Sequence, residues 1–168
     1  LAELDERDIK AIFELALQAL ELGRHEEALG YWKKLAAQAP DFAGAFYYMG
    51  ITYFHLGRYE EALSCLKRAI ELDPESPEIL LVYAKYEICA GDVETSIAYL
   101  DRLLKKDPLN AKAMAALSTA YISRGRKKEG IVLLEKLRKM GFLSSQYLYE
   151  FSKILVSVQR VDYAISLL

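Results

Sequence analysis

A repeat of 34 residues constrains this chain more than any other feature. The segment LGRYEEALSCLKRAIELDPES at 56–76 restates LGRHEEALGYWKKLAAQAPDF at 22–42. Stepping through the 168 residues by 34 gives about 4.7 units with no insertion, after an N-terminal extension of the first helix at 1–8. The units are 9–42, 43–76, 77–110, 111–144 and a truncated 145–168. A period of this length indicates one supersecondary unit stacked on copies of itself within a single domain.

Two positions in every unit hold only small residues. The eighth position of the units reads Ala16, Gly50, Ala84, Ser118 and Ser152, and the twentieth reads Ala28, Ala62, Ser96, Gly130 and Ala164. Large apolar residues surround both positions at spacings of three and four, which is the helical period. We therefore predict two helices per unit whose backbones approach closely at the small residues.

Turn and stop signals separate these helices. Glycine stands at the fifteenth position of the first four units, where it indicates a left-handed helix cap; these are Gly23, Gly57, Gly91 and Gly125. Acidic residues follow, as in GRHEEA and GRYEEA, and carboxylates in a first turn complement the helix dipole. Proline closes the first three units at Pro40, Pro74 and Pro108. Each unit thus reads as helix, turn, helix and stop, and such pairs must stack to bury their apolar faces.

This pattern resembles the tetratricopeptide repeat (TPR) family over about 160 of the 168 positions. The second unit matches best, at Phe46, Met49, Gly50, Tyr53, Gly57, Tyr59, Ala62, Leu66, Ala69 and Pro74. The resemblance implies an all-α fold, a right-handed superhelical solenoid of antiparallel helix pairs, in which the first helix of each pair lines a concave groove. Phe142 in place of the closing proline and Gln159 in place of the glycine predict that regularity decays toward the C-terminus.

Composition excludes several classes of protein. A hydrophobic content of 53% with four prolines favours a continuous core over a disordered linker. No apolar run has the length of a membrane span, and no signal peptide is visible. Because the chain begins at Leu1, we expect a fragment or processed form, cytoplasmic or alternatively periplasmic. The two cysteines, Cys65 and Cys89, are too few for a disulfide framework and are expected to be buried thiols.

No constellation of catalytic or metal-binding residues stands out. The two histidines, His25 and His55, lie in different units at different positions. The pairs Glu26–Glu27 and Glu60–Glu61 start helices, and dipole electrostatics accounts for them without acid–base chemistry. We predict a non-catalytic scaffold or adaptor for protein–protein interaction, with no metal, cofactor or small-molecule substrate. The alternative is a regulatory or substrate-docking segment of a larger multidomain enzyme, such as a glycosyltransferase.

The resemblance places partner binding on the groove. Its lining is apolar and aromatic, which favours an amphipathic helix or an apolar segment as the ligand. The candidate residues are Phe13, Leu17, Leu20, Tyr47, Tyr48, Ile51, Phe54, Leu81, Val82, Lys85 and Ile88. Two alternatives stay open: that some of these side chains only pack on a neighbouring helix, and that another segment of the same chain fills the groove.

One branch of the family binds chaperone C-termini through a clamp of Lys, Asn, Asn, Lys and Arg. The corresponding positions of the first three units are Phe13, Leu17, Tyr48, Glu78 and Val82. The later triples of units do not match either. The sequence therefore argues against a chaperone-tail adaptor.

Charge is divided between the two ends of the chain. Residues 1–110 hold 12 basic and 20 acidic residues, a net charge of −8, whereas residues 111–168 hold 10 and 4, a net charge of +6. A basic patch of Arg124, Arg126, Lys127 and Lys128 is by default a solvated face. The alternatives are an acidic partner or anionic lipid, and the absence of interleaved aromatics disfavours nucleic acid. Opposite charges also predict head-to-tail self-association into open chains.

Overall fold

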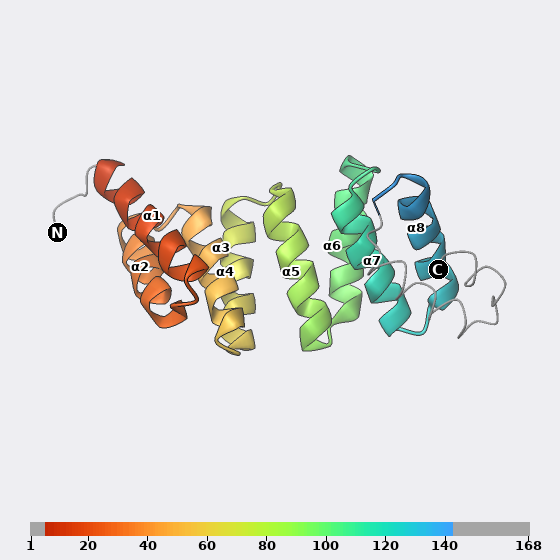
Figure 1. The fold of residues 1–168 in the computed structure, drawn as a ribbon, viewed down its shortest axis with the longest axis horizontal. Helices are drawn as coiled ribbons and strands as arrows, with labels where there is room; N and C mark the ends of the chain where they lie inside the picture. The colour runs from red at the N-terminus through yellow and green to blue at the C-terminus, as the bar shows by residue number, and fades with distance from the viewer. Residues whose placement is uncertain (1–5, 143–168) are drawn as a thin grey trace. The chain divides into compact units, whose positions relative to one another are not determined.

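The computed structural model describes residues 6–142, and within that range every regular element is an α-helix (Figure 1). The helices are α1 (Glu6–Glu21), α2 (His25–Gln38), α3 (Ala43–His55), α4 (Tyr59–Leu72), α5 (Pro77–Ala90), α6 (Val93–Lys106), α7 (Ala111–Ser123) and α8 (Lys127–Lys139). The predicted all-α fold class is confirmed. The fifth repeat, 145–168, lies outside the described residues.

Helix boundaries follow the 34-residue register of the sequence. The helices α3, α5 and α7 begin at 43, 77 and 111, and α2, α4, α6 and α8 begin at 25, 59, 93 and 127. The chain divides into two compact units, one ending at Tyr86 and the other starting at Glu87, so that α5 contributes to both. The single-domain organisation stays a prediction.

The turns within the helix pairs are glycine-capped, as predicted. Gly23, Gly57, Gly91 and Gly125 have φ values of 72°, 74°, 98° and 77°. At the first turn Gly23 N–H donates to the Leu20 carbonyl at 3.0 Å and Arg24 N–H donates to the Ala19 carbonyl at 2.8 Å. This pair of hydrogen bonds is a Schellman motif, which satisfies carbonyls at the end of a helix. The same pattern ends α8 at Gly141, a cap that the repeat register does not anticipate.

The small residues are confirmed as points of close helix contact. A Cβ atom on Gly50 of α3 would lie 2.7 Å from Leu66 Cγ and 3.1 Å from the Ala62 carbonyl oxygen of α4. In the second unit, the Ser118 hydroxyl donates a hydrogen bond of 3.0 Å to the Gly130 carbonyl, joining α7 to α8. A side chain larger than these would separate the paired helices.

Each unit has its own buried cluster. In the first, Ile12 and Ala16 of α1 and Trp32 and Leu35 of α2 are buried together with Ala45 of α3. In the second, a cluster joins α7 to α8 and consists of Met114, Ile131, Leu134 and Leu137. The expectation of two buried thiols is wrong for Cys89, which is exposed, while Cys65 is half-buried.

Candidate partner-binding face of the first helices

The helix α5 shows most clearly which side of the first unit is open. Its buried residues up to Tyr86 are Ile79, Leu80, Tyr83 and Ala84. The intervening positions form an open stripe, which consists of Glu78, Leu81, Val82 and Lys85. Leu81 and Val82 are half-buried, and the charged residues at the two ends are exposed. Spacings of three, four and seven place all four on one side of the helix.

The helix α3 has a similar open side. Tyr47, Tyr48, Ile51 and Phe54 are half-buried, whereas Ala45, Gly50, Thr52 and Tyr53 are buried. The buried Thr52 hydroxyl is satisfied within the helix, because it donates a hydrogen bond of 2.7 Å to the Tyr48 carbonyl. Half-burial leaves part of each of these side chains accessible to a partner.

An aromatic cluster joins three helices of this unit. The Phe13 ring meets Trp32 edge-on at 5.3 Å and Tyr48 edge-on at 5.5 Å, measured between ring centroids. Tyr48 is stacked on Trp32 at 4.9 Å with the planes 11° apart. Trp32 itself is fully buried. The cluster, defined here as Phe13, Trp32 and Tyr48, therefore serves the core as well as the open face.

Five of the eleven candidate residues have such a packing role. Phe13, Leu17, Leu20 and Tyr48 pack on the buried cluster of the first unit. Phe54 packs on a second buried cluster with Tyr53 and Ala62, and its ring is stacked on Tyr86 of α5 at 3.8 Å. These contacts agree with the alternative weighed from sequence, packing on a neighbouring helix, and the role of these residues in partner binding stays a prediction. The remaining half-buried candidates are Tyr47, Ile51, Leu81, Val82 and Ile88.

Tyr47 links the open sides of α3 and α5. Its ring meets Tyr48 edge-on at 4.9 Å. Burial raises the pKa of the Tyr47 hydroxyl, and the neighbouring Tyr48 and the carboxylate of Glu78 raise that pKa further. The influence of Glu78 places a negative charge of α5 close to the Tyr47 hydroxyl.

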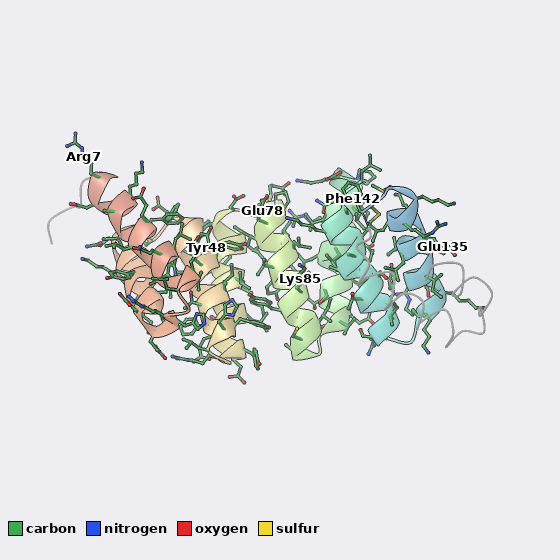
Figure 2. All side chains as sticks on the ribbon, viewed as in Figure 1. Arg7, Tyr48, Glu78, Lys85, Glu135 and Phe142 are labelled. Atoms are coloured by element: carbon green, nitrogen blue, oxygen red, sulfur yellow. The ribbon has the colours of Figure 1, made fainter. Side chains whose placement is uncertain are left out.

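Lys85 and Glu78 are the charged residues of the open stripe, and both are labelled in Figure 2. Glu78 accepts a long hydrogen bond of 3.4 Å from the Ser76 hydroxyl just before the helix. Lys85 makes no hydrogen bond or ion pair with any residue that the structure describes. Ile88 follows Tyr86 and belongs to the second unit.

The structure brings together two histidines that the repeat register keeps apart. The rings of His25, at the start of α2, and His55, at the end of α3, are stacked 5.0 Å apart and 4° from parallel. Their contact joins the first helix pair to the second. Among residues 6–142 there is no group of three or more His, Cys, Asp or Glu side chains placed to hold a metal ion.

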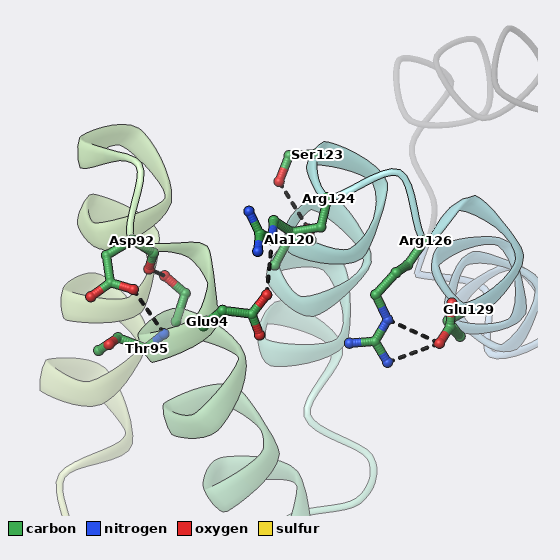
Figure 3. A network of polar contacts seen from close by, with 9 residues as sticks. Asp92, Glu94, Thr95, Ala120, Ser123, Arg124, Arg126 and Glu129 are labelled. Atoms are coloured by element: carbon green, nitrogen blue, oxygen red, sulfur yellow. Dashed lines mark hydrogen bonds and ion pairs between the residues drawn. The ribbon is translucent and has the colours of Figure 1, made fainter.

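The basic patch is partly neutralised by neighbouring carboxylates (Figure 3). Arg124 donates to Glu94 of α6 at 2.9 Å. Arg126 donates from Nε and Nη2 to one oxygen of Glu129, at 3.0 and 2.8 Å. Only part of the positive charge predicted from the sequence is therefore available to a partner, and the patch as a binding site stays a prediction.

Family models confirm the repeat. Models described as tetratricopeptide repeat match residues 10–41, 43–76 and 88–148, which together make up most of the chain. The chain belongs to the tetratricopeptide repeat family. TPR arrays are scaffolds for protein interaction, which is the coarse class predicted from the sequence. No curated protein matches the sequence significantly.

Solved structures share the fold at low sequence identity. MamA 41-end from Desulfovibrio magneticus RS-1 is 21% identical, with 99% of this chain and 93% of that chain covered at a TM-score of 0.86. PilF of Pseudomonas aeruginosa is 15% identical over 96% of this chain and 74% of its own, with a TM-score of 0.85. YrrB, described as a TPR protein with an unusual peptide-binding site, is 15% identical over 93% and 80%, with a TM-score of 0.74. These likenesses establish the fold alone.

Within residues 6–142 no helix combines the length and the apolar character needed to cross a membrane. The compartment stays a prediction.

Proposed function

We propose that this TPR protein is a non-catalytic scaffold that binds the apolar side of an amphipathic partner helix on the open sides of α3 and α5 in its first unit. The observation that carries the proposal is the run of half-buried apolar side chains at Tyr47, Ile51, Leu81 and Val82. These side chains retain surface to bury, and the burial of apolar surface is the main driving force of association.

A helix suits this face better than an extended peptide. The half-buried side chains of Ile51, Leu81 and Val82 carry no hydrogen-bonding groups. An extended ligand laid on them would leave its backbone N–H and C=O groups without partners, which is costly in a buried contact. A helix satisfies its own backbone and presents only side chains.

The test is capture of a partner from a lysate of the source organism with wild type and with the double variant Ile51→Asp/Val82→Asp. These positions are preferable to Tyr48, whose ring is stacked on the buried Trp32, so that Tyr48→Asp threatens folding as well as binding. The expected result is a partner lost from the double variant and retained by Arg68→Glu/Glu71→Arg, which exchanges an exposed ion pair on α4. A partner retained by all three proteins contradicts the proposal.

Folding of the double variant is verified by circular dichroism and thermal unfolding. If it does not fold, Ile51→Ser and Val82→Thr replace it as single variants with smaller polar groups. The alternative proposal is a docking segment of a larger enzyme. The discovery of a catalytic domain in the same polypeptide would favour it. It makes the same prediction for the binding face.

Head-to-tail self-association is a second interaction that charge supports, because the net charges of −8 at residues 1–110 and +6 at residues 111–168 are complementary. Such contacts weaken when salt screens them. Sedimentation at low and high ionic strength tests this: an apparent mass that falls with salt supports self-association, and an unchanged mass contradicts it.

A further inference from the structure

The open stripe of α5 carries opposite charges at its two ends and apolar residues between them. Glu78 and Lys85 are seven residues apart, with Leu81 and Val82 between. Seven residues are nearly two turns, so both charges lie on one side of the helix, about 10.5 Å apart along its axis at 1.5 Å per residue.

Both charges are available to a ligand. Glu78 and Lys85 are exposed, and they are too far apart along α5 to pair with each other. Lys85 has no hydrogen bond or ion pair with the described residues. Among the described residues, Glu78 accepts one hydrogen bond, a long contact of 3.4 Å from the Ser76 hydroxyl, which leaves most of its acceptor capacity unused.

Several exposed charges of the first unit are paired with a neighbour three residues away. Arg58 pairs with Glu61 at 2.6 Å, Arg68 pairs with Glu71 at 2.8 Å, and Arg24 pairs with Glu27 at 3.7 Å. In each pair the two residues are three apart, so that they neutralise one another. The two charges of the open stripe make no ion pair with the described residues, and they border the half-buried Leu81 and Val82.

We infer that the partner helix is amphipathic and bears one basic and one acidic residue seven positions apart, with apolar residues between them. This inference rests on the proposed function and specifies its ligand. The basic residue lies against Glu78 and the Tyr47 hydroxyl, and the acidic residue lies against Lys85. Like charges at either position are repelled, so the two ends act as a filter on a surface that apolar contacts alone would leave unselective.

The environment of Tyr47 supports this assignment. The carboxylate of Glu78 contributes to raising the pKa of the Tyr47 hydroxyl, so the two groups are close enough to interact. A phenol hydroxyl and a carboxylate together offer several acceptor sites to an ammonium or guanidinium group. Charge-assisted hydrogen bonds of this kind are stronger than those between neutral groups.

A display library of helical peptides tests the inference with defined probes. The library carries apolar residues on one side and random residues elsewhere, and it is panned on wild type, Lys85→Glu, Glu78→Lys and Arg68→Glu/Glu71→Arg. Single variants are used because exchanging both charges would be satisfied by the same peptide bound in the reverse direction. Both substituted positions are exposed, so folding is preserved.

Each protein is expected to enrich a different charge pattern. Wild type and the α4 control enrich one basic and one acidic residue seven apart. Lys85→Glu, which presents two acidic residues, enriches two basic residues, and Glu78→Lys enriches two acidic ones. Because exposed ion pairs contribute little, each mismatch is expected to weaken binding by about two- to fivefold at low salt, and less as ionic strength rises.

Failure of this inference is distinguishable from failure of the proposed function. Peptides whose charges are the same on all four proteins, but which Ile51→Asp/Val82→Asp no longer binds, overturn the inference and leave the apolar face as the site. Peptides that the double variant still binds, or no enrichment on any protein, overturn both. A dimer of the wild type that the double variant dissolves also overturns the inference, since the face is then occupied by a second copy.

Discussion

Arg126 bridges two helices of its repeat: its guanidinium lies over the Tyr121 ring of α7, 4.2 Å from the centroid, and donates two hydrogen bonds to Glu129 of α8. Two repeats earlier, Arg58 has the same arrangement: its guanidinium lies 4.6 Å from the centroid of the Tyr53 ring and donates two hydrogen bonds to Glu61. The second and fourth repeats therefore share an arginine that joins the end of the first helix to the start of the second. Cation–π and carboxylate contacts each add modestly at exposed sites.

The first prediction concerns Glu129. The hydrogen bond from Arg126 lowers the pKa of this carboxyl below its ordinary 4.5. We expect Arg126→Ala to return the pKa to that ordinary range, as measured by carbon NMR of the side-chain carboxyl. Since the folded-state pKa is the lower one, the stabilisation from this pair is present above the unfolded value and is lost as pH falls through the folded pKa. Lys128→Ala, which removes a nearby exposed charge, serves as the control and should leave the pKa of Glu129 low.

A second prediction compares two helical glycines. Gly50→Ala places a Cβ 2.7 Å from Leu66 Cγ, so that α3 and α4 must separate, and overpacking of this kind costs about 1–3 kcal/mol. Gly30→Ala in α2 meets no atom within 4 Å and should stabilise the protein by about 1 kcal/mol through helix propensity. Denaturant unfolding of both variants measures the two effects. Equal changes of the same sign would contradict the close-contact interpretation of the small-residue positions.

Repeat chemistry was readable from the sequence because each signal is local. A glycine cap depends on the backbone conformation of one residue, and a first-turn carboxylate depends on its own helix. Residues such as Gly23 and Glu61 therefore have equivalents at the same positions of other repeats. The 34-residue spacing then fixed helix boundaries across the described repeats. The cap at Gly141 escaped detection because it occurs once and out of register.

Contacts between repeats were harder to predict. The stack of His25 on His55 depends on how one helix pair follows the next, which residue spacing does not specify. The same holds for Tyr48, which was assigned to the groove from its helical position but also lies on the buried indole of Trp32. The pairing of Arg124 with Glu94, thirty residues away, reduces a basic patch that looks uncompensated in the linear sequence.

A third prediction distinguishes the two cysteines. Cys89 is exposed and Cys65 is half-buried, and burial, with a further contribution from Glu61, raises the pKa of the Cys65 thiol to about 11. Because the thiolate is the nucleophile, iodoacetamide at pH 8 should modify Cys89 rapidly and Cys65 slowly. Mass spectrometry of tryptic peptides gives the two rates, and addition of denaturant should make them similar. Rapid modification of Cys65 in the folded Cys89→Ser variant would show that its thiol is more accessible than described.

The last prediction uses Trp32, the single tryptophan of the chain, as a reporter of the aromatic cluster. Its side chain is fully buried and the Tyr48 ring covers one face of the indole. We expect blue-shifted emission that iodide quenches weakly in the wild type. Removal of the covering ring by Tyr48→Ala opens that indole face to solvent and should shift the emission to the red with stronger quenching. Tyr59→Ala, which removes an exposed ring that contacts Phe54 instead, should leave the emission unchanged; an equal response of the two variants would mean that Tyr48 does not shield the indole.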